Sequence, residues 1–188
     1  MNKEMMTDSR ILKTKRNTRK ALITLLKHKK YDDISVKDIC EVAGISRGTF
    51  YLHYKDKFDL VEQYQFEITK EGSKRVQSLL QSERHLLYYH IINFWNNEAE
   101  LLLLLISNNG SPDVQNQLKK TLQYNAEKNV FPYTKKSHFS EKERHYFVVF
   151  LSNAIFGIIQ EWVNNGQQET PEELSAIIHK IIPDSLLG

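Results

Sequence analysis

The chain has 188 residues, 40% of them hydrophobic, so it is long enough and apolar enough to bury a core, which excludes an intrinsically disordered protein. Its single cysteine, Cys40, excludes an internal disulfide. The net charge of +3 is unevenly spread, because residues 1–57 hold 14 Lys and Arg against 7 Asp and Glu, whereas residues 58–188 hold 12 against 16. A basic N-terminal part on an acidic body favours nucleic-acid binding by the N-terminal part.

Neither a membrane span nor a targeting signal is expected. The apolar run Leu101–Ile106 is far shorter than the roughly 20 residues that cross a bilayer. The first ten residues, MNKEMMTDSR, lack the hydrophobic core of a signal peptide. We therefore expect a cytoplasmic protein with no membrane partner.

The first predicted helix begins at Thr7, Asp8 or Ser9, each of which can cap a helix N-terminus, and it ends near Lys29. Basic residues crowd its first half, namely Lys13, Lys15, Arg16, Arg19 and Lys20. A solvated helix face and direct contact with DNA explain this cluster equally well, since only one side of a helix can face a duplex.

Residues 35–57, SVKDICEVAGISRGTFYLHYKDK, predict two short helices joined by a tight turn. Ser35 and Asp38 can form a capping box at the start of the first of these helices. Its apolar or small residues recur at i, i+3, i+4 and i+7 and so share one face: Val36, Ile39, Cys40 and Ala43. Gly44 can adopt the left-handed conformation that ends a helix, and Ser46 can cap the next one. With the preceding helix, this corner predicts a three-helix helix-turn-helix domain.

The second helix of the corner, residues 46–53, has a packing side and a presenting side. Phe50 and Tyr54 fall together on the packing side. The other side carries groups that suit a DNA groove, since a guanidinium can bind guanine, and hydroxyl, imidazole and ammonium groups can bind phosphate. An ordinary helical corner with solvated polar residues explains the pattern equally well when the corner is taken alone. The candidate DNA-binding residues are Ser35, Ser46, Arg47, Gly48, Thr49, Tyr51, Leu52, His53, Lys55 and Lys57.

This stretch resembles the DNA-binding domain of the TetR family of bacterial transcription regulators. The resemblance covers residues 14–60 and rests on Ile34, Gly44-Ile45-Ser46, Gly48-Thr49-Phe50-Tyr51, His53-Tyr54 and Lys57. The chain departs from the family pattern at Cys40, where a small residue such as alanine is common, and at Tyr54, where phenylalanine is frequent. The rest of the chain is similar to the family only in length and helical character.

The resemblance also implies roles for individual residues of the second helix. It implies that three of them lie near bases: Arg47, Gly48 and Tyr51. It implies that three others lie on phosphates: Thr49, His53 and Lys57.

Beyond Asp56 the sequence predicts further helices, so we expect an all-α protein. One helix links the head to the body and reaches a softer region at Gly72-Ser73, and two helices within residues 83–106 break near Asn96-Asn97. Another helix begins after Ser111 and ends near Val130. We divide the chain into a helix-turn-helix DNA-binding domain, residues 1–57, and a C-terminal helical bundle for effector binding and dimerisation, residues 58–188.

The last two predicted helices are strongly apolar. The helix from Glu141 to about Asn165 is apolar nearly all round, and the helix that starts at Thr170-Pro171 has an unbroken apolar stripe. Because a helix that is apolar on both sides must be buried on both, we expect these helices to pair with their copies in a four-helix dimer interface, as the resemblance also implies. Packing within one chain is the alternative. The candidate interface residues are Phe156, Ile159, Val163, Leu174, Ile177, Ile178 and Ile181.

Aromatic side chains of the body can line an apolar cavity for a small effector, because tyrosine and tryptophan combine a large area with a polar tip. The candidates are Tyr89, Phe94, Trp95, Tyr124, Tyr146 and Phe150. For each of them taken singly the bundle core is the favoured place, and the pocket itself follows mainly from the resemblance.

No enzyme activity, cofactor or metal site is expected. The seven histidines are spread along the chain, and the sequence contains no HExxH, P-loop, GxGxxG or GxSxG motif. The sequence thus predicts a homodimeric regulator that binds a palindromic DNA operator and is released by an unknown small effector, a repressor by the commoner role of the family. The alternatives are an activator, a regulator that responds to a protein partner, and a helical adaptor without DNA binding.

Overall fold

The computed structural model describes residues 3–82, 86–134, 136 and 138–182, and within these ranges it contains helices and no strand. The elements are α1 (Lys3–Leu26), the 3-10 turn η1 (Tyr31–Asp33), α2 (Val36–Ala43), α3 (Arg47–Tyr51), α4 (Lys57–Ser82), α5 (Leu87–Glu98), α6 (Glu100–Ile106), α7 (Pro112–Asn125), the π-helix η3 (Ala126–Val130), the 3-10 turn η4 (Phe131–Tyr133), α8 (Glu141–Asn164) and α9 (Pro171–Ile181). The prediction of an all-α fold is confirmed.

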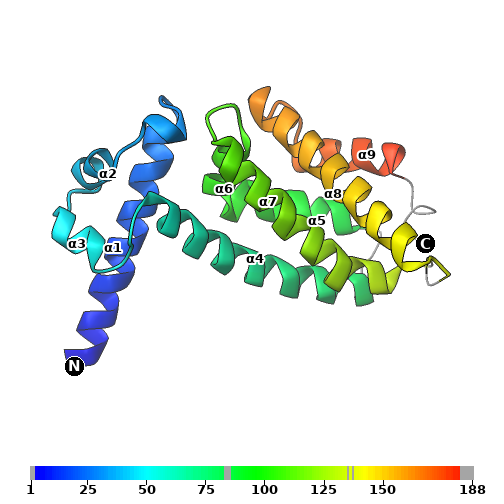
Figure 1. Cartoon of the computed structure of the whole chain (residues 1–188), viewed down its shortest axis with the longest axis horizontal. Coiled ribbons are helices and arrows are strands. Elements are labelled where there is room, and N and C mark those ends of the chain that lie inside the picture. The colour runs from blue at the N-terminus through cyan, green and yellow to red at the C-terminus, as the bar shows by residue number, and fades with distance from the viewer. Residues whose placement is uncertain (1–2, 83–85, 135, 137, 183–188) are drawn as a thin grey trace.

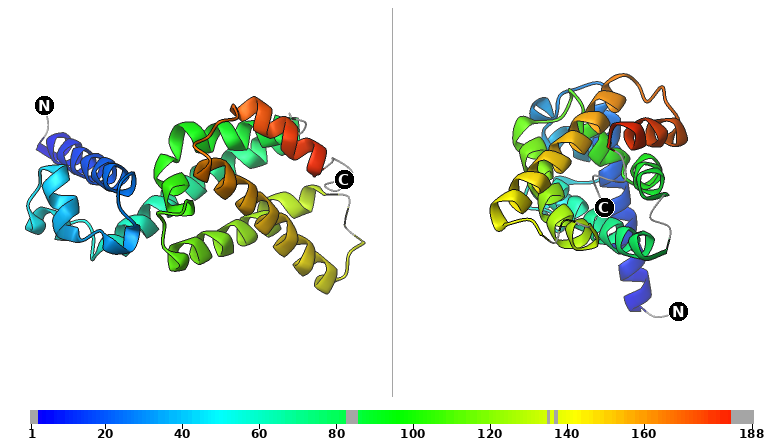
Figure 2. Two further views of the ribbon diagram at one scale, coloured as in Figure 1. Left: turned by 90° about the horizontal axis from the view of Figure 1, so that it is seen from above. Right: turned by 90° about the vertical axis from the view of Figure 1, so that its right-hand side faces the viewer.

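The molecule consists of a head and a body joined by one long helix. In Figure 1, α1, α2 and α3 form the head at one end, and α5 to α9 form the body at the other. Helix α4 runs from the head into the body, and the view from above in Figure 2 shows the same division. Helix α4 is therefore the covalent link between the head and the body.

The head has the helix-turn-helix form that its capping residues predict. The Ser35 hydroxyl accepts from the Asp38 N–H (3.2 Å), and the Asp38 carboxylate accepts from the Ser35 N–H (2.8 Å). Gly44 has a φ of 66°, the left-handed conformation that ends α2. The Ser46 hydroxyl accepts from the Thr49 N–H (3.0 Å) and caps α3. The core beneath is made of fully buried side chains, namely Leu22, Leu26, Tyr31, Ile34, Ile39, Phe50 and Leu60.

Several helix boundaries differ from the predicted ones. Helix α1 already starts at Lys3, in a segment rich in good helix formers, and ends at Leu26. Helix α4 continues through Gly72 and Ser73 without a break. The expected start of the next helix, residues 83–85, lies outside the described residues. The break between α5 and α6 lies at Ala99 and not near Asn96-Asn97. The Tyr64 hydroxyl donates to the Glu98 carbonyl there (3.1 Å), which satisfies an oxygen at the end of α5.

A loop of the body provides a second connection to the head. The Asn109 side-chain N–H donates to the backbone oxygen of Leu26 (2.8 Å), and the Asn109 carbonyl accepts from the Tyr31 N–H (2.7 Å). On the other side of the loop, the Asn108 N–H donates to the side-chain oxygen of Asn164 at the end of α8 (2.9 Å). The end of α1 is thus tied to the body by hydrogen bonds that do not pass through α4.

Helix α6 forms the centre of the body, and α8 covers it. Five of the seven α6 residues are buried: Leu101, Leu102, Leu103, Leu105 and Ile106. Helix α8 is long and apolar enough to cross a membrane by length and composition, a property that the sequence analysis did not anticipate, and a third of its apolar window is buried within the chain. A single helix of this kind is weak evidence for a membrane, because bundle helices pass the same test. Its inner side packs on α6 and α7, and its outer side stays apolar and uncovered.

Candidate nucleic-acid interface and internal cavity

The outer surface of α3 and its N-cap carries half of the predicted DNA-binding residues. Phe50 and Tyr54 are buried on the inner side, with ring centroids 5.4 Å apart, and they hold α3 against the head core. On the outer side, Tyr51 is 49% exposed and Leu52 is 81% exposed. A leucine exposed to this extent beside polar neighbours is suited to an apolar contact such as a thymine methyl group. The structure brings together on this surface Ser46, Arg47, Gly48, Tyr51 and Leu52.

Gly48 leaves room for a close approach to the backbone of α3. A Cβ atom at this position would meet only the Ser46 hydroxyl oxygen, at 3.7 Å. The α3 backbone is therefore open toward solvent here, and a DNA backbone can approach closely.

The predicted phosphate-binding hydroxyls also serve the helix caps. The Ser46 and Thr49 hydroxyls lie 2.9 Å apart, next to the capping bond of α3. The Ser35 hydroxyl donates to the Asp38 carboxylate (2.8 Å) while it accepts from the Asp38 N–H. These hydrogen bonds lower the pKa of Asp38. Ser35 is therefore first a capping residue, and a phosphate contact would have to share its hydroxyl.

His53 and Lys55 follow α3 and lie between the head and α4. The His53 carbonyl accepts from the Gln63 side chain of α4 (3.2 Å), and its ring is half-buried. The side chain of Lys55 is exposed, while its backbone N–H donates to the Asp59 carboxylate (2.8 Å) and thereby lowers the pKa of Asp59. Lys55 is thus held by its backbone and has its ammonium in solvent.

The ammonium of Lys57 is turned inward, although the resemblance implied that Lys57 lies on a phosphate. It donates to the backbone oxygens of Tyr31 (2.8 Å), Asp32 (3.1 Å) and Ile34 (2.8 Å). An ammonium has three donors, so these bonds use them all. Burial lowers the pKa of Lys57, against the opposing effect of the nearby carboxylates of Asp32 and Asp33. The Tyr31 hydroxyl donates in return to the Lys57 carbonyl (3.0 Å), so the two residues fasten η1 to the start of α4.

One member of the basic cluster on α1 is also used internally. The Arg19 guanidinium pairs with the Glu67 carboxylate of α4 and lies 5.1 Å from the centroid of the Tyr64 ring. Arg19 therefore faces α4. The side chains of Lys13, Arg16 and Lys20 are exposed. The basic cluster therefore has one member that packs against α4, Arg19, and at least three that are exposed to solvent.

The body contains a cavity of about 190 Å³ that is partly open to solvent and is lined mainly by α4, α5, α7 and α8, with residues of α6, η3 and α9. Two of the predicted pocket residues, Phe94 and Trp95, line it. The other four do not: Tyr89, Tyr124, Tyr146 and Phe150. Three of these are exposed on the outer sides of their helices, because the aliphatic side chains of the same helices take the inner positions: Tyr124, Tyr146 and Phe150. The sequence did not predict the aliphatic residues of the lining. The apolar stripe along α4, which includes Ile68, Val76 and Leu79, could have indicated them.

The predicted dimer residues divide into an inner and an outer set. Four are buried within the chain and leave no surface for a partner: Phe156, Ile159, Leu174 and Ile178. Three of these four line the cavity. Val163 is half-buried, while Ile177 and Ile181 are exposed. The inner set therefore packs within its own chain, which was the alternative to the dimer interface, whereas the outer set of α9 stays exposed.

The described residues contain no group of three or more His, Cys, Asp and Glu side chains placed to hold a metal ion. Burial raises the pKa of the Cys40 thiol, which lies on the packed face of α2.

Comparison with known proteins agrees with this arrangement. A family model described as "Bacterial regulatory proteins, tetR family" matches residues 20–64, and one described as "Transcriptional regulator C-terminal region" matches residues 82–184, more than half of the chain. The uncharacterized HTH-type transcriptional regulator YxbF of Bacillus subtilis (strain 168) is 44% identical over 54 residues, which make up 29% of this chain and 14% of that protein. The chain thus matches only a small part of that relative.

Solved structures share the fold along nearly the whole chain. A TetR transcriptional regulator from Streptococcus agalactiae 2603V has a TM-score of 0.65 at 23% identity, over 95% of this chain and 98% of that one. A TetR-family transcriptional regulator from Syntrophomonas wolfei has a TM-score of 0.71 at 16% identity, and the fatty acid degradation regulator FadR from Bacillus halodurans one of 0.69 at 14%, each over 93% of this chain and 95% of the other. Since both of its parts match the same family, the chain belongs to the TetR family and is a DNA-binding transcription regulator and not an enzyme.

Proposed function

We propose that this regulator acts in the cytoplasm as a homodimeric repressor that binds a palindromic operator and is released by a small effector. The observation that carries the proposal is the course of α4, which is fastened to the head by Lys57 and lines the body cavity from Ile68 to Leu79. A molecule that enters the cavity contacts the helix that positions the head. Regulators of this family typically dimerise and bind small effectors, which supports the same arrangement.

The outer surface of α3 is the proposed reading surface, within a DNA-binding domain of residues 1–57. Arg47 donates to guanine, Gly48 allows close approach, and Leu52 contacts a thymine methyl group. Tyr51 completes the base contacts. The phosphates are bound by exposed or half-buried groups beside this surface: Ser35, Ser46, Thr49, His53 and Lys55.

Two exposed apolar surfaces of the body, residues 58–188, are proposed to meet their copies in the dimer. On α8, Tyr146 is 71% exposed and Phe150 is 57% exposed, and about two turns after Phe150 Gly157 leaves open space around its backbone. On α9, Ile177 and Ile181 are exposed one turn apart. Monomeric proteins rarely leave apolar side chains of this size uncovered in a row, so a partner surface is favoured.

The effector response is proposed to travel by two routes. The first is α4, whose hydrogen bonds to α7 and η3 border the cavity: Ser73 donates to Asn125 (2.8 Å), and Gln77 donates to Asn129 (2.9 Å). The second is the Asn109 loop, which ties the end of α1 to the body. A change of helix spacing in the body thus alters the distance between two heads and shifts the population between DNA-competent and incompetent states.

Selection of bound sequences from random duplexes tests the proposal, together with sedimentation of the full chain. We expect an enriched palindrome whose half-sites lie about one helical turn, ~34 Å, or a multiple apart, and a dimer at micromolar concentration. A monomer that binds single half-sites would contradict the proposal that the regulator is a homodimer. A chain that shows no salt-dependent duplex binding would point instead to an adaptor role.

A further inference from the structure

The side chains that line the cavity of the body restrict the chemical class of ligand that can bind there. We propose that it binds an uncharged, mainly aliphatic molecule, in preference to a carboxylate or an amine. The inference rests on the proposed effector response at the same cavity and names the class of the effector. The size of the ligand follows from the cavity volume of about 190 Å³. Because a cavity of about 150 Å³ holds benzene, the buried part of the ligand has roughly eight non-hydrogen atoms.

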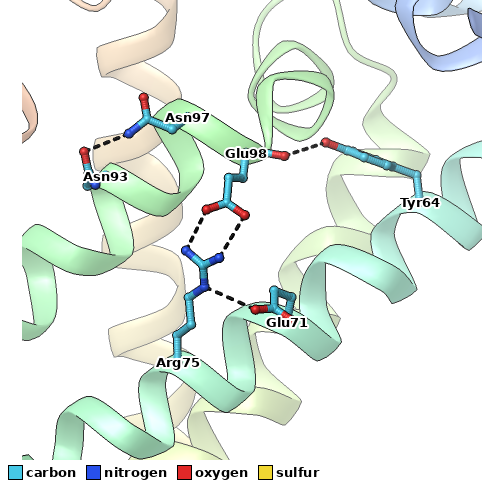
Figure 3. Close-up of polar contacts among 6 residues, drawn as sticks. All are labelled: Tyr64, Glu71, Arg75, Asn93, Asn97 and Glu98. Atoms are coloured by element: carbon cyan, nitrogen blue, oxygen red, sulfur yellow. Dashed lines mark hydrogen bonds and ion pairs between the residues drawn. The ribbon is translucent and has the colours of Figure 1, made fainter. Parts of the chain in front are cut away.

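The charge nearest to the cavity is already neutralised. Among the described lining residues, Arg75 and His90 are those that can carry charge. The two terminal nitrogens of Arg75 donate to the two carboxylate oxygens of Glu98 (2.7 and 2.9 Å), as Figure 3 shows. Its Nε lies 3.4 Å from a Glu71 carboxylate oxygen. This parallel pairing already neutralises the guanidinium, so a ligand carboxylate would have to compete with Glu98 and Glu71 for it.

Both ionisable lining residues also pack against rings. The Arg75 guanidinium carbon lies 4.6 Å from the centroid of the Phe94 ring, and the His90 ring lies 5.1 Å from that of Tyr89. The cavity lining contains no Asp, Glu or Lys among the described residues. A ligand amine therefore finds no carboxylate partner in the lining, and burial of an unpaired charge is strongly unfavourable.

The polar lining residues are largely satisfied by one another. The Asn125 side-chain oxygen accepts from the Ser73 hydroxyl (2.8 Å) and from the Asn129 amide (3.1 Å), and the Asn125 amide donates to the Thr121 carbonyl (2.8 Å). The Asn125 amide has a second N–H, which the contacts of the described residues leave unused. One neutral acceptor, such as a hydroxyl or carbonyl oxygen, suits this donor. The lining thus accommodates one weakly polar group on an otherwise aliphatic ligand.

The local backbone supports a ligand at this end of the cavity. Helix α7 passes directly into the π-helix η3, and three of its five residues line the cavity: Ala126, Asn129 and Val130. Turns of π-helix are rare and occur often at functional sites.

Direct binding of matched eight-carbon probes to the full chain without DNA tests the inference. The probes are 1-octanol, octanoate and octylammonium, each below its solubility limit. The readouts are calorimetry and tryptophan fluorescence, to which Trp95 of the cavity lining and Trp162 both contribute. We expect 1-octanol to saturate one site per chain, and both ions to bind at least tenfold more weakly. Octanoate or octylammonium binding as tightly as 1-octanol, or no saturable 1-octanol binding, would overturn the inference.

Cavity-filling variants locate the probe. Ile155→Phe on α8 and Leu122→Phe on α7 place larger side chains in the lining, and each should weaken 1-octanol at least tenfold. Ile158→Phe makes the same change on α8 outside the lining and should retain binding. A circular dichroism melt of each variant confirms that it is folded. The two filling substitutions lie on different helices, so if one variant is unfolded, the other still tests the inference. Unchanged binding by a folded filling variant would overturn the inference.

A separate measurement of DNA affinity distinguishes this inference from the proposed function. If 1-octanol binds at the cavity and the DNA affinity stays the same, the ligand class is supported and the effector response fails. If a charged molecule binds in the cavity and releases DNA, the effector response holds and the proposed ligand class is wrong.

Discussion

We expect the ammonium of Lys57 to hold the head together and not to contact DNA. Lys57→Met keeps the aliphatic stem and removes three hydrogen bonds to backbone oxygens of 2.8 to 3.1 Å. Hydrogen bonds to charged groups contribute about 1.5–3 kcal/mol each, and water can replace the partner at the more exposed Asp32. The free energy of unfolding should therefore fall by about 2–4 kcal/mol, roughly the value of one to two such bonds.

Urea unfolding and a salt titration of DNA binding check this expectation with a matched control. Lys55→Met removes an exposed ammonium two residues away, so it should change stability by less than about 0.5 kcal/mol. A phosphate contact by Lys55 would lower the slope of log K against log salt by about 0.9, whereas Lys57→Met should leave the slope unchanged under conditions where it is folded. If Lys57→Met keeps full stability and loses one unit of slope, the inward placement of the ammonium is refuted.

Three further predictions concern the caps and the outer face of the body. Gly44→Ala should cost about 1–2 kcal/mol in urea unfolding, because φ is 66° and a Cβ meets no atom within 4 Å, so only backbone strain acts; no loss would contradict this. The hydrogen bonds from Ser35 lower the pKa of Asp38, so the Asp38 carboxylate stabilises the fold above its unfolded pKa of about 3.9. This stabilisation is lost as the pH falls through the lower folded pKa. Asp38→Asn should therefore flatten the acid side of a plot of melting temperature against pH. Phe150→Glu should shift a sedimenting dimer toward monomer, whereas Tyr124→Glu, an equally exposed site on α7, should not.

Local signals in the sequence were sufficient for the head. The Ser35–Asp38 capping box, the left-handed Gly44 and the Ser46 cap depend on residues three or fewer positions apart, and the structure contains each of them. Phe50 and Tyr54 share the buried side of the corner for the same reason, since helical periodicity alone places them together. The family motif rests on these same residues.

Contacts between segments far apart in the chain could not be predicted from the sequence. Lys57 binds carbonyls 23 to 26 residues earlier, and an ammonium suits a ring of carbonyl oxygens as well as a phosphate, so residue type could not decide between them. Phe156 and Ile178 lie on apolar stripes that periodicity detects, but periodicity does not say whether a stripe faces the core of its own chain or a partner. Large aromatic residues such as Tyr146 were expected inside, although α8 exposes Tyr146 and Phe150 and lines the cavity mostly with aliphatic residues.

Binding of the enriched duplex by the wild-type chain and by Arg47→Ala tests the central claim, that the outer surface of α3 reads the operator, most directly. The account predicts a loss of about 1–3 kcal/mol for Arg47→Ala and a relaxed preference at one symmetric base pair in each half-site. A variant that binds the enriched duplex with wild-type affinity and unchanged preference would contradict the account, because the arginine on the proposed reading surface would then contribute nothing to recognition.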